Sequence, residues 1–201
     1  MDCVYIVHYL PNTDRKAYII QSNIFQNFNV VWNTSYQTID SLPPIHRRIT
    51  DKELCVYLAH KEILEDVVAK KYKSFLILED DALINDFEDF SSFIKNVNTE
   101  FLNSDSDMLF AAEAPPEWNL KVHNPNPNQL IYSDVTQCSL ASHCYSIKVD
   151  KIPQILENFK YDLPIDHEFN RLINVLGLKV AWSYPGVRQG THTRMFKSNL
   201  R

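Results

Sequence analysis

The sequence predicts a single α/β domain whose central, mostly parallel sheet is flanked by helices. Apolar, β-branched segments alternate with helical segments over the first half of the chain, which is typical of parallel strands joined by helical crossovers. The chain has 201 residues and is 45% hydrophobic, enough for one domain with a sizeable core. It shows no internal repeat and no linker, so we expect one domain spanning residues 1–201.

The first elements follow from short apolar runs. Residues 3–9 are apolar and β-rich, which predicts a buried first strand. Pro11-Asn12-Thr13 is turn chemistry. A helix is then predicted from Asp14 to about Phe28, and a second short strand over residues 29–32.

The clearest helix start lies at Thr50. Thr50 and Glu53 have the spacing of a capping box, in which each side chain accepts a hydrogen bond from the other residue's amide. The helix should run to about Lys71, and its apolar stripe comprises Leu54, Tyr57, Leu58, Leu64, Val67 and Val68. A buried strand over residues 74–78 follows and ends directly in three acids.

In the second half of the sequence, predicted strands and helices alternate less regularly. Its predicted strands are 108–112, 130–135, 143–149 and 178–182, and its predicted helices are 89–97, 150–159 and 166–176. Gly177 should end the last helix as a C-terminal cap. Residues 113–128 are rich in Pro and Asn and predict a long functional loop. From about residue 183 we expect an irregular tail that could close over a site.

Composition excludes several classes of protein. A net charge of −5 and a pI near 5.8 are unlike the basic stripe of a nucleic-acid binder. Three glycines are too few for a dinucleotide fingerprint or a P-loop. A bound nucleotide would therefore be held by side chains and a metal. The four cysteines form no Cys-x-x-Cys pair, which argues against structural zinc.

Targeting signals are also missing from the sequence as it stands. No apolar run approaches the roughly 20 residues of a membrane helix. The first residues lack the basic and apolar regions of a signal peptide. We therefore expect a cytoplasmic protein with reduced thiols and no transmembrane segment.

The strongest functional signal is the run Glu79-Asp80-Asp81 at the end of a buried strand. Strand ends in open α/β sheets are where ligands bind. Strand alternation predicts that Glu79 and Asp81 point the same way and Asp80 the opposite way. Three neighbouring carboxylates repel one another unless a cation or hydrogen-bond donors compensate, and Mg²⁺ or Mn²⁺ suits such oxygen ligands. The alternative is a solvated acidic turn.

These residues carry a resemblance to a known family. Leu54-Cys55-Val56-Tyr57-Leu58-Ala59-His60 followed by Phe75-Leu76-Ile77-Leu78-Glu79-Asp80-Asp81-Ala82 resembles glycosyltransferase family 25. That family includes bacterial lipooligosaccharide galactosyltransferases and procollagen galactosyltransferases. Its pattern is Gly-Cys-x-x-Ser-His, then a strand ending Leu-Glu-Asp-Asp. This chain has Leu54 for the Gly and Ala59 for the Ser.

Further segments extend the resemblance over nearly the whole chain. They are Asp14-Arg15, Cys144-Tyr145-Ser146-Ile147, Pro164-Ile165-Asp166 and Pro185 through Gln189. The resemblance implies a GT-A (Rossmann-like) fold and metal-dependent transfer of a hexose, galactose or glucose, from a UDP-sugar to an acceptor hydroxyl, with inversion. A glycan or a hydroxylated protein would be the acceptor. Residues 115–129 match no known segment of the family.

The resemblance also assigns roles to residues. Asp81, Glu79 and His192 would hold Mn²⁺ or Mg²⁺. The residues for the donor nucleotide would be Arg15, Glu79, Asp80, His60, Arg188 and Gln189, with Arg194 as a further cation for the diphosphate. Asp166 would be the base that takes the acceptor proton, and Glu168 is its substitute.

Each assignment has a structural alternative. Arg15 would otherwise be an exposed first-turn residue, and Asp166 a helix N-cap. His60 is expected either to orient Asp80 by a hydrogen bond or to be a buried structural histidine. His192 could simply be a solvent-exposed tail residue. Trp118 could stack on a sugar or merely pin its loop.

Two functions from different classes remain open at this point. One is the transferase, favoured by the acids at 79 and 81 together with Asp166. The other is a catalytically silent relative that binds a nucleotide-sugar or glycan, which the changes at Leu54 and Ala59 keep open.

Overall fold

The computed structural model describes residues 1–36, 38, 48–113, 129–132 and 142–190. Its strands form one seven-stranded sheet in the order β2-β1-β3-β6-β4-β7-β5. They are β1 (Cys3–Val7), β2 (Val30–Asn33), β3 (Phe75–Glu79), β4 (Met108–Ala112), β5 (Gln129–Tyr132), β6 (Cys144–Ile147) and β7 (Val180–Val187). The predicted α/β class is confirmed.

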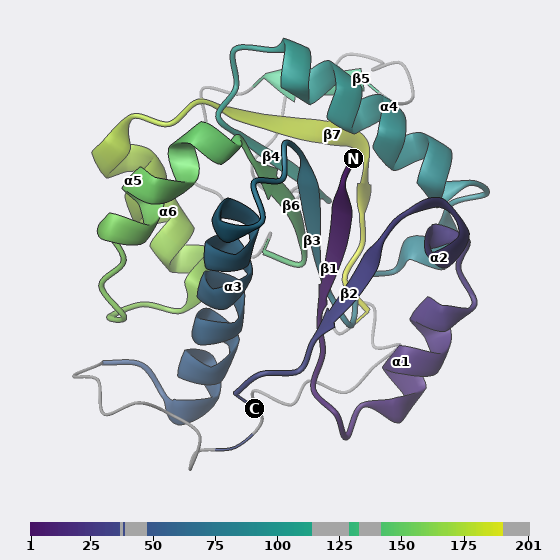
Figure 1. The fold of residues 1–201 in the computed structure, drawn as a ribbon, viewed down its shortest axis with the longest axis horizontal. Helices are drawn as coiled ribbons and strands as arrows, with labels where there is room; N and C mark the ends of the chain where they lie inside the picture. The colour runs from purple at the N-terminus through teal and green to yellow at the C-terminus, as the bar shows by residue number, and fades with distance from the viewer. Residues whose placement is uncertain (37, 39–47, 114–128, 133–141, 191–201) are drawn as a thin grey trace.

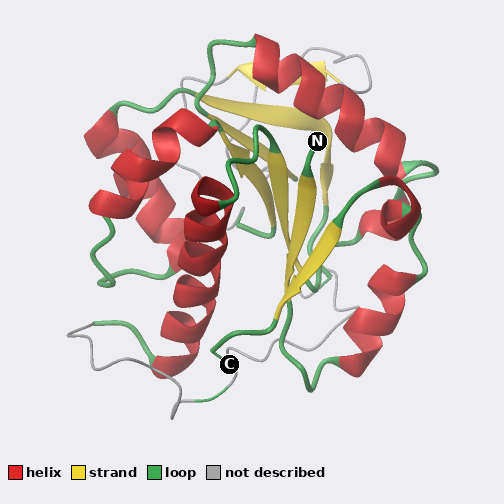
Figure 2. Ribbon diagram, in the orientation of Figure 1, coloured by secondary structure: helices red, strands yellow, loops and turns green. Residues whose placement is uncertain are grey.

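Helices cover both faces of this sheet. They are α1 (Thr13–Ile20), α2 (Ile24–Asn27), α3 (Asp51–Ala69), α4 (Phe90–Asn103), α5 (Ile152–Glu157) and α6 (Ile165–Leu176), with short 3₁₀ turns η2 (Ile84–Asp86) and η4 (Val149–Lys151). Figures 1 and 2 show α3, α5 and α6 on one side of the sheet and α1, α2 and α4 on the other. The molecule therefore has three layers, as an amphipathic helix on each face of a buried sheet requires.

The sheet is mixed, which corrects the prediction of mostly parallel pairing. β1 runs parallel to both β2 and β3, and β4 runs parallel to β7. β6 lies antiparallel between β3 and β4, and β5 is antiparallel to β7. The parallel strands β1, β2 and β3 come from the first half of the sequence, where strands and helices alternate. β5 and β6 follow each other without a predicted helix, so no crossover dictates a parallel direction.

Two predicted helix ends are confirmed in detail. The Thr50 hydroxyl accepts a hydrogen bond from the Glu53 amide at 3.3 Å, and the Glu53 carboxylate accepts one from the Thr50 amide at 2.8 Å. This capping box satisfies amides that the first turn of α3 would otherwise leave unpaired. At the end of α6, Gly177 adopts φ 63°, the left-handed conformation that favours glycine.

Two other elements differ from expectation. The single helix predicted from residue 14 to 28 is divided into α1 and α2. The chain turns between them, where the Ser22 hydroxyl donates a hydrogen bond to the Ile19 carbonyl at 2.7 Å and competes with continued helix. β7 extends to Val187, so the tail is not irregular from residue 183. Gly186 permits this extension, because a Cβ there would lie 2.4 Å from the carbonyl oxygen of Ala112.

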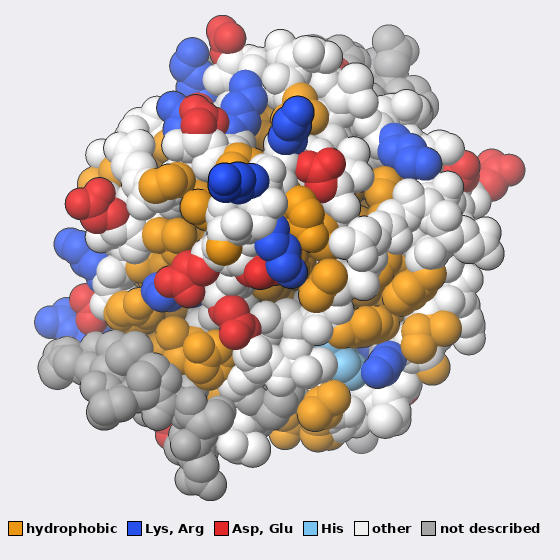
Figure 3. Space-filling view, in the orientation of Figure 1, with side chains coloured by type: hydrophobic (Ala, Val, Ile, Leu, Met, Phe, Trp, Pro, Cys, Tyr) orange, Lys and Arg blue, Asp and Glu red, His pale blue; other side chains and the backbone are white. Residues whose placement is uncertain are grey.

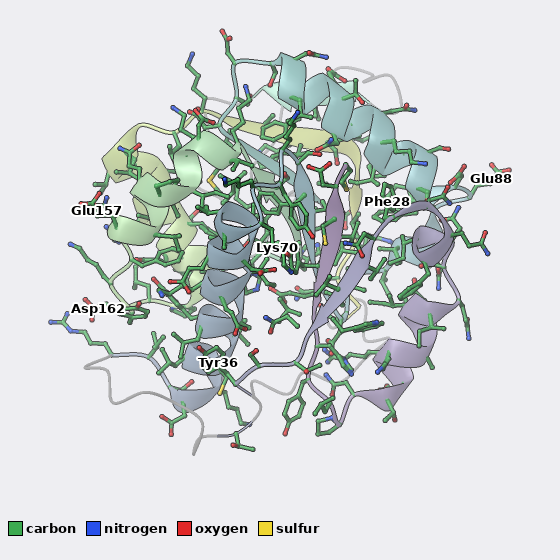
Figure 4. All side chains as sticks on the ribbon, viewed as in Figure 1. Phe28, Tyr36, Lys70, Glu88, Glu157 and Asp162 are labelled. Carbon is green, nitrogen blue, oxygen red and sulfur yellow. The ribbon has the colours of Figure 1, made fainter. Side chains whose placement is uncertain are left out.

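Apolar side chains fill the space between the layers, while charged ones extend outward. Figure 4 shows sticks crowded between the sheet and α3, with Glu88 and Glu157 extending away at opposite margins. On the face seen in Figure 3, acidic and basic side chains are interspersed. Among the residues described, no helix is both long enough and apolar enough to cross a membrane.

Candidate functional site at the carboxyl ends of β1 and β3

The acidic run lies where two parallel strands end together. Val7, the last residue of β1, is in register with Glu79, the last residue of β3. The Asp80 amide donates to the carbonyl of Val7 at 3.0 Å. The residues that follow β1 therefore meet the residues that follow β3 at one edge of the sheet, which is the usual place for a ligand site in an α/β fold.

Asp80 is the anchor of this edge. Its carboxylate accepts hydrogen bonds from Arg15 at 2.7 Å, His8 Nδ1 at 2.9 Å, Asn12 at 3.0 Å and the Tyr9 amide at 3.2 Å. Burial alone would raise the pKa of Asp80, but the bonds from His8 and Arg15 outweigh it and hold the pKa below its usual range. Four donors occupy this carboxylate, so we assign it a structural task rather than ligand contact.

Arg15 is not the exposed first-turn residue of the structural alternative. Its side chain is 9% exposed, and its guanidinium lies 2.7 Å from Asp80 and 3.9 Å from Asp81. The predicted contact with a diphosphate would require it to share its donors with Asp80. In this structure the positive charge of Arg15 compensates the negative charges of Asp80 and Asp81.

Glu79 faces the opposite side, toward α3. Ser142 donates to its Oε1 at 2.8 Å, and His60 Nε2 lies 3.4 Å from the same oxygen. Burial raises the pKa of Glu79, but the contacts with His60 and Ser142 prevail and lower it. The side chain is 19% exposed. The expectation that His60 orients Asp80 is wrong, because α3 packs on the face to which Glu79 points.

Asp81 lies in the turn after the strand. It is 3% exposed, its Oδ1 is 3.5 Å from Gln189 Nε2, and its Oδ2 is 3.9 Å from Arg15. Glu79 and Asp80 do point oppositely, as predicted. The alternation ends there, because β3 stops at Glu79 and a turn closed by the Ala82 amide carries Asp81 to the Arg15 side.

The segment after β7 joins this turn. The Leu83 amide donates to the carbonyl of Arg188 at 2.8 Å, and the Gly190 amide donates to the carbonyl of Asp81 at 2.7 Å. The structure thus brings Arg188 and Gln189 beside the acids, as the resemblance implied. The Arg188 guanidinium itself pairs with exposed Asp86 at 2.6 Å.

The two candidate bases differ sharply. Asp166 is the second residue of α6, partly exposed, and accepts a hydrogen bond from the His167 amide at 2.8 Å. It is not the N-cap, which is Pro164. Glu168 is 0% exposed, and Arg171, Tyr57 and the Lys160 amide all donate to it. Glu168 is therefore a structural link and a poor substitute base.

Several predicted residues cannot be placed. Trp118, His192 and Arg194 lie outside the described residues. Conversely, no site role was predicted from the sequence for His8, Asn12 and Ser142, which contact the acids, or for Tyr145, which contacts His60. The signal for His8 was present, since a polar residue directly follows the apolar strand β1 there, as Asp80 follows β3.

The acids fit a divalent cation only in company with a ligand. Among the described residues, no group of three or more His, Cys, Asp or Glu side chains could hold a metal ion. Mg²⁺ and its analogues, however, are commonly held by one or two carboxylates plus substrate phosphates. Glu79 suits this role, because the described side chains that contact its carboxylate, Ser142 by a hydrogen bond and His60 at 3.4 Å, both lie at Oε1 and not at Oε2.

Comparison with known proteins adds no assignment. No protein-family model matches the chain, and no curated protein does. The function therefore rests on the residues and their geometry.

Proposed function

We propose that this protein is a GT-A-type, metal-dependent glycosyltransferase that moves galactose or glucose from a UDP-sugar to an acceptor hydroxyl. The observation that carries the proposal is that neighbouring carboxylates of the acidic run, Asp80 and Glu79, have different hydrogen-bonding environments. Asp80 accepts hydrogen bonds from four donors, whereas the described side chains that contact the Glu79 carboxylate both lie at its Oε1. The mixed seven-stranded sheet between helices is compatible with that fold.

Charge supports a cationic ligand at this edge. Arg15 compensates Asp80 directly at 2.7 Å but lies 3.9 Å from Asp81, and within the described part of the chain the Glu79 carboxylate is contacted by Ser142 at 2.8 Å and His60 at 3.4 Å. Three consecutive carboxylates thus lie in a largely buried place, where a bound cation would offset the repulsion among them. A divalent metal there would act as a Lewis acid that stabilises the departing diphosphate.

The chain's own residues would complete the transfer. Glu79 and Asp81 leave the end of β3 on opposite sides, so each would contribute an oxygen to a cation at that end together with the diphosphate, and Gln189 would orient Asp81. Asp166 would take the proton of the acceptor hydroxyl as the sugar transfers with inversion. Glu168, fully buried and bound to Arg171, would hold α6 in place instead of moving a proton.

The direct test is a donor screen. We expect slow hydrolysis of UDP-galactose or UDP-glucose by the purified protein with Mn²⁺, measured as UDP release, and none when EDTA replaces the metal. Release from neither donor, together with tight Mn²⁺-dependent UDP binding, would favour the catalytically silent binding relative. Absence of both would refute the proposal.

A further inference from the structure

A buried tyrosine–histidine pair lies behind Glu79. His60, in the middle of α3, and Tyr145, on β6, are both 0% exposed. The Tyr145 hydroxyl is 2.9 Å from His60 Nδ1, and the two rings stack with centroids 5.6 Å apart and planes 21° apart. The sheet places β6 directly beside β3, so the pair lies next to the strand that carries Glu79.

The direction of the Tyr145–His60 hydrogen bond follows from a count of donors and acceptors. Burial holds the pKa of Tyr145 well above its usual value, so the hydroxyl keeps its proton. Within the described part of the chain, the acceptor beside that hydroxyl is His60 Nδ1. A buried O–H group needs an acceptor, so Tyr145 donates to Nδ1. The neutral ring must then carry its own proton on Nε2.

That Nε2 proton faces Glu79. Nε2 lies 3.4 Å from Glu79 Oε1, longer than the usual 2.7–3.2 Å for such a bond. Nε2 is fully buried and has no better-directed partner among the described residues. A buried N–H left at this distance favours a small approach of the carboxylate, because an unsatisfied buried donor costs about 1–3 kcal/mol. After such an approach His60 would join Ser142 in donating to Oε1.

We propose that Tyr145 and His60 are positioning residues that hold Glu79 by Oε1 and present Oε2 to a divalent cation bound together with the nucleotide. This inference rests on the proposed function for its ligand. The tautomer of His60 does not depend on any ligand. A purely structural role would be served as well by phenylalanine at position 145, since Tyr145 already packs against Phe169 and Phe110.

The main test compares two buried tyrosines. Tyr145→Phe keeps the ring and removes the hydroxyl that fixes His60. Tyr57→Phe is the matched control, because Tyr57 is equally buried on the helix of His60, but its hydroxyl contacts Glu168 at 3.2 Å. With Mn²⁺ and UDP as the calorimetric probe, Tyr145→Phe should weaken binding about tenfold, as loss of a residue that orients a metal ligand does. The control should stay within about twofold of wild type.

His60 variants provide a rescue that a packing role would not. Glutamine can accept from Tyr145 and donate to Glu79, whereas leucine can do neither. We expect His60→Gln to retain more UDP affinity than His60→Leu, with both compared at equal folded fraction. Equal loss in the two variants, or equal affinity of Tyr145→Phe and Tyr57→Phe, would overturn the positioning role.

A ligand-free readout separates this inference from the proposed function. Imidazole ¹⁵N NMR of the wild type should show His60 protonated on Nε2, and Tyr145→Phe should show a mixture of tautomers. An Nδ1-protonated His60 in the wild type would overturn the inference even if UDP binds. If the wild type binds no UDP with Mn²⁺, the proposed function fails and the cation-presenting role of the pair fails with it, whatever the tautomer.

Discussion

Asp80→Ala should lower the free energy of unfolding by about 3–5 kcal/mol, the usual cost of breaking a buried ion pair. The substitution leaves Arg15, with a side chain 9% exposed, as a buried charge without its closest partner, and removes the acceptor of His8 and Asn12. Urea denaturation at neutral pH measures the effect. A cost of this size is a large share of the 5–15 kcal/mol by which domains are stable.

The protein contains its own control for this prediction. Asp86 also pairs with an arginine, Arg188, at 2.6 Å, but the two side chains are 36% and 49% exposed. Asp86→Ala removes the same kind of ion pair from solvent and should cost less than about 1 kcal/mol. Equal effects of the two substitutions would show that Asp80 is not the structural anchor of the site.

Asp166→Asn should lower sugar transfer by ~10²–10⁴, the usual contribution of a positioned base. Asparagine keeps the shape of the side chain and loses the charge that accepts the proton. Because Asp166 is the second residue of α6 and not its cap, the lost favourable interaction with the helix dipole is only about 0.3–1 kcal/mol. Initial rates with a saturating UDP-sugar, together with the melting temperature, measure the two effects.

Glu168→Gln tests the same assignment from the other side. Glu168 holds Arg171 at 2.8 Å and is 0% exposed, so its substitution should destabilise the fold while the rate per folded molecule changes little. UDP affinity should be unchanged in Asp166→Asn, because the base acts on the acceptor. Full activity of Asp166→Asn at unchanged stability would remove Asp166 from the mechanism.

Local sequence signals predicted most of the architecture. The capping box at Thr50, the cap at Gly177 and the strand Met108–Ala112 all appear as expected, because each depends on neighbouring residues alone. The prediction of a mostly parallel sheet was wrong for β5 and β6, because strand direction depends on how distant segments pair. β6 inserts between β3 and β4, and nothing in its own four residues indicates that position.

The site was predicted in part for the same reason. The position of Glu79-Asp80-Asp81 at a strand end was readable from the sequence, and so was the opposite orientation of Glu79 and Asp80. The side chains that contact these acids could not be predicted from the sequence. His60 is 19 residues from Glu79 along the chain, and which acid it meets depends on the face that α3 covers. Tyr145 enters only through the antiparallel pairing of β3 with β6.

Calorimetric titration of UDP into the protein, with Mn²⁺ and then with EDTA, tests the central claim most directly. The account predicts binding with Mn²⁺ that is lost in EDTA. It also predicts that Asp81→Ala weakens Mn²⁺-dependent binding at least tenfold, about 1.4 kcal/mol, whereas Glu65→Ala, in the exposed pair with Lys61 on α3, leaves it unchanged. Equal UDP affinity with Mn²⁺ and in EDTA would contradict the claim that Glu79 and Asp81 hold a metal for the nucleotide.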